Sequence, residues 1–308
     1  MISLVVPTRN RAHTLRLVAP SYYQQDKVDE IIFVDDAGDE GTAETIAPIA
    51  RAWPGTTTKI LRNAARLGAS QSRNVGVAAA ANDFILFCDD DEYLERGYAA
   101  ALLDKLAEPD VAAVSGRRVY MQEGESPQEA LRRFGHGMRR GKPFRATICE
   151  YVNGAIYHGD IDLPFTNAII LTRKDLLGRF PFDAYYARGN GYREETDYQM
   201  NLYVNGYRIR VTNDVHSIHL PPLQVRTGGQ RTQRFNRIYW SIFYTRYFFA
   251  KYYDRYSERM GLRVPRWLAL GLFAGFAVYR ECLRPPLYRA AMAAVRGRRL
   301  LAARESQP

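Results

Sequence analysis

The chain has 308 residues, of which 46% are hydrophobic and 25% charged, and this composition excludes a disordered protein. Its length suits one large α/β domain with an appendage, or two domains. The net charge of +10 is uneven, because from residue 226 onward 17 Lys and Arg face 4 Asp and Glu, so that the tail carries +13 and residues 1–225 carry −3.

The cysteines and the first residues give expectations about the compartment. Cys88, Cys149 and Cys282 are far apart and have no paired spacing, so we expect reduced thiols and a cytoplasmic setting. Residues 1–10 lack the basic region and long apolar run of a signal peptide, and their pattern predicts a strand instead.

The first third of the chain alternates short apolar runs with segments of helical spacing, which is the pattern of a doubly wound α/β unit. The apolar runs predict strands over residues 2–6, 31–34, 57–61, 85–88 and 112–119. Helices are expected over residues 14–24, 42–51 and 98–107, and an Ala-rich helix is expected to end near residue 82.

Three of these strands stop at polar or acidic loops. The loops contain Pro7 with residues 8–11, Asp35 with Asp36, and the triplet Asp89, Asp90 and Asp91. The carboxyl ends of parallel strands meet at one edge of a sheet, which is where open α/β sheets bind their ligands. Adjacent carboxylates repel one another and are not buried unpaired, so the triplet predicts a site for a hard divalent cation.

The middle of the chain is less regular. Residues 121–147 are polar and Gly-rich and predict a mobile excursion with a short helix near 127–134; its basic residues are Arg132, Arg133, Arg139, Arg140 and Lys142. Strand-like runs follow in residues 148–173, most clearly over 165–171, and a helical turn follows at 174–178. A further helix over 192–203 and strands over 207–211 and 215–219 are expected.

The tail combines aromatic and basic residues. Residues 233–260 have helical spacing and many aromatic side chains, and residues 267–279 contain no charged side chain. The uncharged stretch is shorter than the ~20 residues that cross a bilayer. An interfacial or re-entrant membrane segment is favoured by the flanking Arg263, Arg266, Arg280, Arg284 and Arg289, and the alternative is a helix buried against the main domain or a dimer mate. The basic charge predicts an anionic partner: phospholipid, a phosphorylated lipid carrier or nucleic acid.

Six segments occur in the order found in the family 2 inverting glycosyltransferases, and residues 1–222 resemble that family. The segments are residues 5–11 (VVPTRNR), 33–36 (FVDD), 66–76 (RLGASQSRNVG), 87–91 (FCDDD), 194–197 (EETD) and His219. The resemblance implies the GT-A fold, a doubly wound, mixed but mostly parallel sheet flanked by helices. We expect this domain to span residues 1–225 and a helical, basic appendage to span 226–308.

The resemblance also implies a site for a nucleoside-diphosphate sugar. The residues implied to bind the nucleotide are Pro7, Thr8, Arg9 and Asp36 at the base and ribose, Asp35 in support of the loop, and Arg66, Gly68 and Arg73 along the nucleotide and diphosphate. The residues implied to bind Mn²⁺ or Mg²⁺ are Asp91 and His219, with Asp89 shared between the metal motif and the ribose, and Asp90 as the ligand if the register shifts by one. His216 is expected to be a bystander.

Glu195 lies where the family keeps its general base. The usual residue there is Asp, so Glu195, alone or together with Glu194, is implied to deprotonate the acceptor hydroxyl. Asn167 is expected to contact the donor sugar, and Asp197 to be structural or to face the acceptor. The loop containing His158, Asp160 and Asp162 is expected to line the acceptor cleft rather than to form a second metal site.

These features predict a metal-dependent displacement with inversion, on a lipid-linked or polysaccharide acceptor, by a protein peripheral to the inner face of the cytoplasmic membrane. One alternative is a nucleotidyltransferase, but such an enzyme ordinarily has a Gly-rich, basic phosphate loop after its first strand, and residues 7–10 are not one. Another is a protein that grips nucleic acid with its tail, but aromatic residues at helical spacing more often pack, and no nucleic-acid partner is expected.

Overall fold

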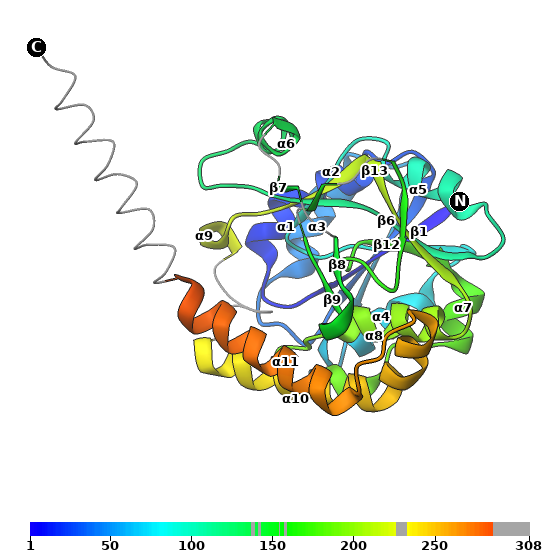
Figure 1. Ribbon diagram of the computed structural model, residues 1–308. Helices are drawn as coiled ribbons and strands as arrows, with labels where there is room; N and C mark the ends of the chain where they lie inside the picture. Colours follow the sequence, from blue (N-terminus) through cyan, green and yellow to red (C-terminus); the bar gives the residue numbers. More distant parts are fainter. Residues whose placement is uncertain (137–138, 141–142, 154, 157–158, 226–232, 286–308) are drawn as a thin grey trace, which may run out of the picture.

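The computed structural model describes residues 1–136, 139–140, 143–153, 155–156, 159–225 and 233–285. These residues form one large sheet with helices on both faces, and a helical hairpin near the C-terminus lies along one side (Figure 1). The loop residues His158 and Lys142 and the basic end of the tail, including Arg289, lie outside the described residues.

The large sheet is mixed and mostly parallel. Its strands are β1 (Ile2–Thr8), β2 (Val28–Asp35), β3 (Thr57–Arg62), β4 (Phe84–Phe87), β5 (Glu92–Leu94), β6 (Val111–Tyr120), β11 (Ile161–Leu163), β12 (Ile170–Arg173) and β13 (Arg208–His219). Their order is β11-β13-β6-β12-β4-β1-β2-β3, and β5 pairs with β13. Strands β4, β1, β2 and β3 are parallel neighbours, whereas β12 is antiparallel to both β4 and β6.

Helices cover both faces of the sheet because its strands are buried on both sides. One face carries α1 (Ala12–Val18), α2 (Pro20–Tyr23), α3 (Thr42–Arg51) and α5 (Tyr98–Leu106); the other carries α4 (Gly68–Ala79), α7 (Lys174–Arg179) and α8 (Glu194–Val204). Successive residues of β1 alternate between the faces, so Leu4 and Val6 join one apolar cluster and Val5 joins the other.

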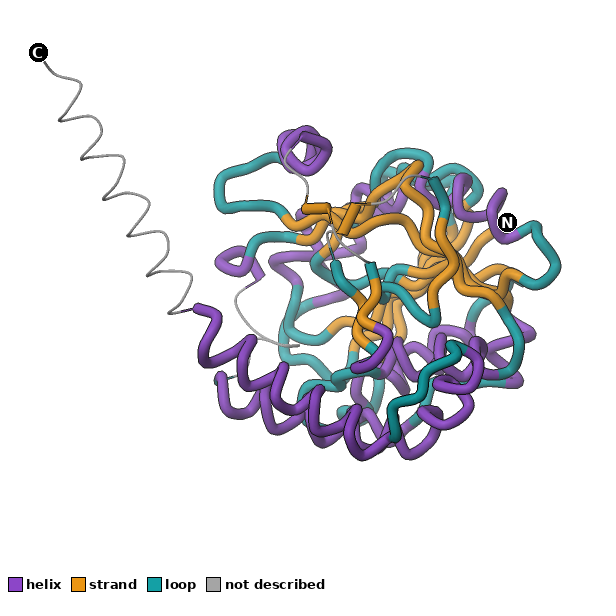
Figure 2. Tube along the Cα trace, viewed as in Figure 1, coloured by secondary structure: helices purple, strands orange, loops and turns teal. Residues whose placement is uncertain are grey.

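Shorter elements lie beside the sheet (Figure 2). They are α6 (Pro127–His136), β7 (Arg139–Arg140), β8 (Phe144–Arg145), the 3₁₀ turns η1 (Ala146–Ile148) and η2 (Ala184–Ala187), β9 (Glu150–Tyr151), β10 (Ala155–Ile156) and α9 (Pro222–Val225). Strands β7 and β10 pair with each other, as do β8 and β9.

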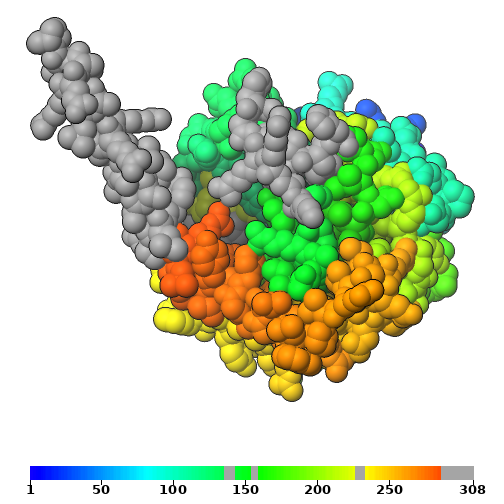
Figure 3. Space-filling view, in the orientation of Figure 1, coloured from blue at the N-terminus to red at the C-terminus, as the bar shows by residue number. Residues whose placement is uncertain are grey.

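The C-terminal hairpin consists of α10 (Arg234–Arg259), α11 (Arg266–Val278) and a π-helical turn, η3 (Tyr279–Leu283). Aromatic residues of α10 and the buried stripe Ala269, Phe273 and Ala277 of α11 pack inward, at the spacing of four expected of one helix face. The hairpin therefore lies against the segment that holds β8 and β9, as the space-filling view shows (Figure 3).

The opposite face of α11 stays exposed and apolar. Trp267 is 73% exposed and Leu272 is 47% exposed. One side of the uncharged stretch is thus packed against the chain and the other is open, and its association with a membrane stays a prediction. Within the described residues, no helix has both the length and the apolar character needed to cross a membrane.

Most of the expected strands and their common edge are confirmed, and three details differ. The run expected as a strand over residues 165–171 is irregular up to residue 169, and only its last two residues belong to a strand, β12. The helix expected over residues 14–24 is split into α1 and α2, because Pro20 has no backbone N–H to continue a helix and begins α2 instead. The strands expected over 207–211 and 215–219 are one strand, β13, with a bulge where Thr212 pairs with Gly116 and His216 with Arg117. The domain boundary near residue 225 stays a prediction.

Candidate active site

A cavity of about 720 Å³ opens at the carboxyl ends of β1, β2 and β4. Parallel neighbouring strands bring their following loops together there, as expected for an open α/β sheet. Of the residues singled out from sequence, those that line the cavity are Pro7, Thr8, Arg9, Asp36, Arg66, Gly68, Arg73, Asp89, Asp90, Asp91, Glu194, Glu195 and His219.

Asp36 shapes one side of the cavity through the loop before α4. Its carboxylate accepts hydrogen bonds from the backbone N–H groups of Leu67, at 2.6 Å, and Gly68, at 2.9 Å. Gly68 has a φ of +80°, and a Cβ there would lie 2.7 Å from the carbonyl oxygen of Ala187. Only glycine allows both this backbone conformation and this close approach, so the loop forms one wall of the cavity.

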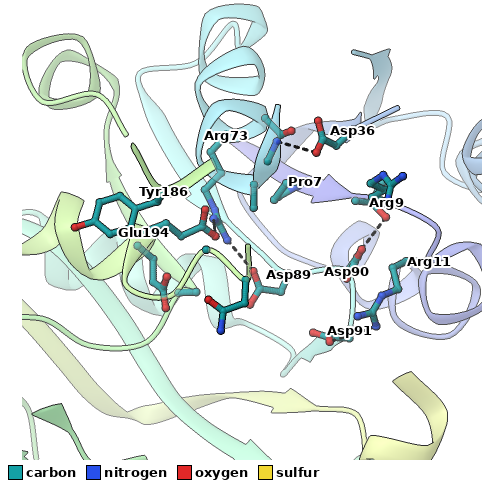
Figure 4. A pocket seen from close by; sticks show the side chains of 18 of the residues that line it. Pro7, Arg9, Arg11, Asp36, Arg73, Asp89, Asp90, Asp91, Tyr186 and Glu194 are labelled. Atoms are coloured by element: carbon teal, nitrogen blue, oxygen red, sulfur yellow. Dashed lines mark hydrogen bonds and ion pairs between the residues drawn. The ribbon is translucent and has the colours of Figure 1, made fainter. Parts of the chain in front are cut away.

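The three aspartates of the triplet point to different partners (Figure 4). Asp89 pairs with two guanidinium groups, Arg73 at 2.9 Å and Arg118 at 3.1 Å. Asp90 accepts a hydrogen bond of 2.8 Å from the hydroxyl of Thr8. Asp91 lies 3.7 Å from Arg11 and 3.7 Å from His219. Each carboxylate of the triplet therefore has partners of its own, which offset the repulsion among the three side chains.

These environments separate the pKa values of two neighbouring carboxyl groups. Burial, joined by the charge of Asp91, raises the pKa of Asp90 to about 7. Burial acts in the same direction on Asp89, but Arg73 and Arg118 outweigh it and lower the pKa of that carboxyl. Asp89 is therefore a firmly ionised anchor for arginines, whereas Asp90 readily takes up a proton.

The two glutamates stand at the first turn of α8. Glu194 is buried, and its Oε1 pairs with Arg73 at 2.5 Å. Its Oε2 is also buried and accepts no hydrogen bond among the described residues. Glu195 is half-buried and lines the cavity, and within the described part of the chain no Lys or Arg forms an ion pair with it.

Burial raises the pKa of both glutamates, Glu194 to about 7. The positive charge of Arg73 opposes the rise at each, and the charge of Glu195 adds to it at Glu194. A carboxylate with a raised pKa is a stronger proton acceptor, which is the property a general base requires near neutral pH.

Arg193, directly before these glutamates, is held in an unusual conformation. Its φ is +75°, in the left-handed region that costs a non-glycine residue about 1–3 kcal/mol. Its guanidinium donates to Thr245 at 2.8 Å and to the carbonyl of Cys149 at 3.0 Å, and lies 4.7 Å from the ring centroid of Phe248. Contacts with α10 thus fix the start of α8.

The donor atoms near Asp91 fit a divalent ion that arrives with a phosphorylated ligand. His219 Nδ1 lies 2.6 Å from the carbonyl oxygen of Leu220, which selects the tautomer with its proton on Nδ1 and leaves Nε2 directed at Asp91. Among the described residues no three His, Cys, Asp or Glu side chains form a complete metal site. Mg²⁺ and similar ions are commonly held by one or two side chains plus substrate phosphates, so two donors suffice.

Two residues do not line the cavity: Asn167, which was expected to contact the donor sugar, and Asp197, which was expected to be structural or to face the acceptor. The Asn167 side chain is used inside the protein, where it donates to the carbonyl of Gly116 and accepts from Ile169 N–H, each at 2.9 Å. Asp197 is buried against α10 and pairs with Lys251 at 2.9 Å. Asp35 supports the loop, as expected, by accepting from Gly38 N–H at 2.7 Å.

His216 also lies away from the cavity lining, as expected of a bystander. Its Nδ1 lies 2.8 Å from Glu95 on the other side of the strand end. Sequence reasoning missed several residues that do line the cavity. They are Arg11, Arg118, Tyr120, Tyr186, Ala187, Gly189, Asn190 and Gly191. In the sequence, only Gly189 and Gly191, just before the acidic start of the helix, indicated that this segment forms part of the cavity wall.

Arg73 is predicted to be the main electrostatic support of the site. Arg73→Met removes the partner of a buried glutamate and of Asp89, and is expected to lower the free energy of unfolding by about 3–5 kcal/mol at neutral pH. Urea unfolding measures this loss. The loss should shrink at acidic pH, because protonation removes the unpaired charge of Glu194.

Arg66→Met is the matched control, since Arg66 also lines the cavity but is exposed. It should change the stability by no more than about 0.5 kcal/mol. Equal losses in the two variants would show that the ion pairs of Arg73 do not stabilise the fold.

A mixed, mostly parallel sheet with this cavity at its strand ends is the arrangement of the GT-A glycosyltransferases. Residues 3–168 match the family model described as glycosyl transferase family 2. The chain belongs to that family, and the resemblance inferred from six short segments is confirmed.

Curated relatives are similar over part of the chain. The pre-mycofactocin glycosyltransferase of Mycobacterium tuberculosis is 32% identical over 126 residues, which are 41% of this chain and 25% of the relative. The GalNAc(5)-diNAcBac-PP-undecaprenol beta-1,3-glucosyltransferase of Campylobacter jejuni is 30% identical over 129 residues, 42% of this chain and 41% of the relative. The chain thus spans less than half the length of these relatives.

Solved structures share the fold over more of the chain. The mannosyltransferase PcManGT from Pyrobaculum calidifontis, in complex with GDP-Man and Mn²⁺, has a TM-score of 0.60 at 18% identity, covering 96% of this chain and 79% of that one. S. aureus TarS 1-349 in complex with UDP-GlcNAc has a TM-score of 0.56 at 15% identity, covering 91% and 72%. These likenesses show the fold.

Proposed function

We propose that this protein transfers a sugar from a nucleoside-diphosphate sugar to an acceptor hydroxyl, with inversion and with the help of Mn²⁺ or Mg²⁺. One observation carries the proposal. A single cavity holds donors suited to a diphosphate-bound cation, Asp91 and His219, and a carboxylate of raised pKa, Glu195, on a different element.

The donor would lie along the strand ends. The nucleoside lies against Pro7, Thr8 and the loop that Asp36 holds in place, where the cavity wall is built from backbone and small polar groups. Arg9 and Arg66 line the same cavity and supply positive charge for the phosphates. Asp91 and His219 would hold the metal ion, which when bound neutralises charge on the leaving diphosphate.

Glu195 is assigned the role of general base. Its carboxylate lines the cavity without an ion-pair partner among the described residues, whereas Glu194 is committed through one oxygen to Arg73. Glu195 accepts the proton of the acceptor hydroxyl as its oxygen attacks the anomeric carbon. The bond to the diphosphate breaks on the opposite face, so the configuration inverts in one displacement.

Glu194 supports this role by its position. It is connected through Arg73 to Asp89, so that an arginine links the helix carrying the base to the acid triplet. In Figure 4, Asp89 lies between Glu194 on one side and Asp90 and Asp91 on the other. The buried Oε2 of Glu194 has no hydrogen-bond donor among the described residues. In this proposal it accepts a hydrogen bond from a second hydroxyl of the acceptor.

The acceptor proposed is lipid-linked, at the cytoplasmic face of a membrane. The name of the C. jejuni relative, a GalNAc(5)-diNAcBac-PP-undecaprenol beta-1,3-glucosyltransferase, supports this class of acceptor. So does the exposed apolar face of α11, where Trp267 and Leu272 are followed by Arg280 and Arg284. Such a face suits the interface of a bilayer that contains anionic lipids.

The proposal is tested by a screen of nucleoside-diphosphate sugars for protection against thermal unfolding, with and without Mn²⁺. One donor class should raise the unfolding temperature only in the presence of the metal ion. Release of a nucleoside diphosphate, and no release of pyrophosphate, should then accompany turnover. Pyrophosphate release from a nucleoside triphosphate and a sugar phosphate would instead support a nucleotidyltransferase.

The pH dependence of the reaction should report the raised pKa of the base. An ordinary Glu has a pKa of about 4.3, and burial raises that of Glu195. Because the base acts deprotonated, kcat/KM should fall as the pH decreases through this raised pKa, above the ordinary value for Glu. A pH–rate profile on purified protein measures the acidic limb, and a rate unchanged down to pH ~4.5 would exclude a base with a raised pKa.

A further inference from the structure

A second cavity of about 720 Å³ lies between the small strands β8 and β9 and the end of α11. Its lining combines aromatic rings with arginines. The residues are Tyr120, Arg145, Glu150, Tyr151, Val152, Asn153, Phe276, Tyr279, Arg280 and Arg284. None of these side chains was singled out as a site residue, and the proposed chemistry at Glu195 does not use them.

The charge on this cavity is positive. Three guanidinium groups face one carboxylate, that of Glu150. Glu150 is already shared, because it lies 3.2 Å from Arg280 and 3.4 Å from the buried Arg193 and accepts from Tyr192 at 3.2 Å. The negative charge of Glu150 is therefore already paired with groups of the folded protein.

Arg145 and Arg284 remain for a ligand. Both are exposed, and among the described residues neither forms an ion pair with a carboxylate. Arg145 lies 4.4 Å above the ring of Phe276, which orients its planar group beside the cavity. Oriented guanidinium groups recognise phosphate oxygens by paired hydrogen bonds, so the lining is suited to a phosphate or diphosphate.

The second cavity adjoins the catalytic one. Tyr120 lines both, and its ring lies 5.3 Å from the ring of His219, the residue assigned to the metal ion. A single acceptor molecule can therefore pass Tyr120, with a hydroxyl at Glu195 and an anionic group among the arginines. Aromatic rings at such a passage suit the faces of sugars.

The other end of the second cavity opens toward the exposed face of α11. Phe276 belongs to α11, and Tyr279 and Arg280 belong to the turn that follows. Tyr279 and Leu283 in that turn are 44% and 53% exposed. Figure 3 shows the orange hairpin against the green segment that holds β8 and β9, the two parts of the chain that line the cavity.

We propose that this second cavity binds the phosphate group of an isoprenoid-linked acceptor, with Arg145 and Arg284 on its oxygens and the apolar chain leaving along α11. The proposal rests on the glycosyltransferase function proposed above and adds where the acceptor is held. It makes Arg145 and Arg284 determinants of acceptor affinity that do not touch the donor.

The test is calorimetric binding of farnesyl diphosphate to the full chain, in Mn²⁺ and with a saturating nucleoside diphosphate (UDP or GDP) in the cell, so that the donor site is already occupied. Arg145→Gln/Arg284→Gln is expected to weaken binding about tenfold or more. Arg51→Gln/Arg96→Gln removes the same charge from two exposed arginines that line neither cavity, and should keep the wild-type affinity. Both arginine pairs are exposed, so equal unfolding temperatures are expected.

Two further probes separate the sources of the anionic group. Inorganic pyrophosphate alone should bind more weakly than farnesyl diphosphate, because it lacks the chain that contacts the aromatic lining. Glucuronic acid should not compete. Equal farnesyl diphosphate affinity in wild type and in the Arg145/Arg284 variant, or displacement by the nucleotide, would overturn the second site. Failure of UDP and GDP to bind at all would instead count against the proposed function.

Discussion

Glu195→Gln is expected to lower kcat for sugar transfer by about 10²–10⁴-fold, which is the contribution of a positioned general base. The amide keeps the size of the side chain but accepts no proton. Nucleotide affinity should stay within about twofold, because Glu195 lies on α8 and not on the strand ends that carry Pro7 and Asp91. Single-turnover kinetics and nucleotide titration measure the two quantities separately.

Glu194→Gln provides the comparison. Glu194 is paired with Arg73, so this change should reduce stability as well as rate and should leave measurable transfer. A Glu195→Gln protein with near wild-type rate, or a larger rate loss in Glu194→Gln at equal stability, would move the role of base to Glu194.

Asp91→Asn is expected to remove the dependence of nucleotide binding on divalent metal. In the wild type, Mn²⁺ should increase the affinity for the nucleoside diphosphate; in the variant, we expect a loss of about 100-fold or more when the ion is present and little change when it is absent. The reason is that Asp91 and His219 face each other across 3.7 Å, whereas Asp89 is bound by two arginines. Titrations of the nucleoside diphosphate in Mn²⁺ and in EDTA measure its affinity with and without the metal ion.

Asp90→Asn is the matched control within the triplet. The pKa of Asp90 is raised to about 7, so its carboxyl is substantially neutral near pH 7, and an amide preserves the acceptor for the Thr8 hydroxyl. Its metal-dependent affinity should stay close to that of the wild type. If instead Asp90→Asn loses the metal dependence and Asp91→Asn retains it, Asp90 is the ligand.

The strand pattern was predictable because each buried strand is short and apolar and ends abruptly. β1, β2 and β4 are neighbours, which places Asp36 and the triplet at one edge, as their positions at strand ends required. Residues on these loops could be assigned to one cavity for that reason. Two things identify the residues at this edge: the local sequence that ends each strand, and the rule that open α/β sheets bind ligands at the carboxyl ends of their strands. Both can be applied to the sequence alone.

Residues that depend on packing across the sheet were not predictable in the same way. Arg118 reaches Asp89 from β6, which is separated from β4 in the sheet by β12. For Asp197 the sequence left a structural role and an acceptor-facing role open, although two residues along a helix turn the side chain by about 200° relative to Glu195. That rotation directs Asp197 to Lys251 on α10, a partner unknown before the hairpin was placed.

The uncharged stretch of the tail also needed the structure. Ala269, Phe273 and Ala277 have the spacing of a buried stripe, but Trp267 and Leu272 are as apolar and are exposed. Composition alone gives no direction around a helix that is apolar on all sides. The contact of α11 with η1 and α10 decides which side is covered.

Through Arg193, contacts made by helix α10 influence the position of the glutamates at the start of α8. A non-glycine backbone in the left-handed region reverts to an ordinary conformation unless its surroundings prevent it, and here contacts of the Arg193 side chain with Thr245 and Phe248 of α10 supply the restraint. Substitutions in α10 can therefore change the position of Glu195 without contacting the sugar or the nucleotide. Divergence among homologues in their C-terminal helices is a route to altered turnover that leaves the recognisable motifs of the sheet intact.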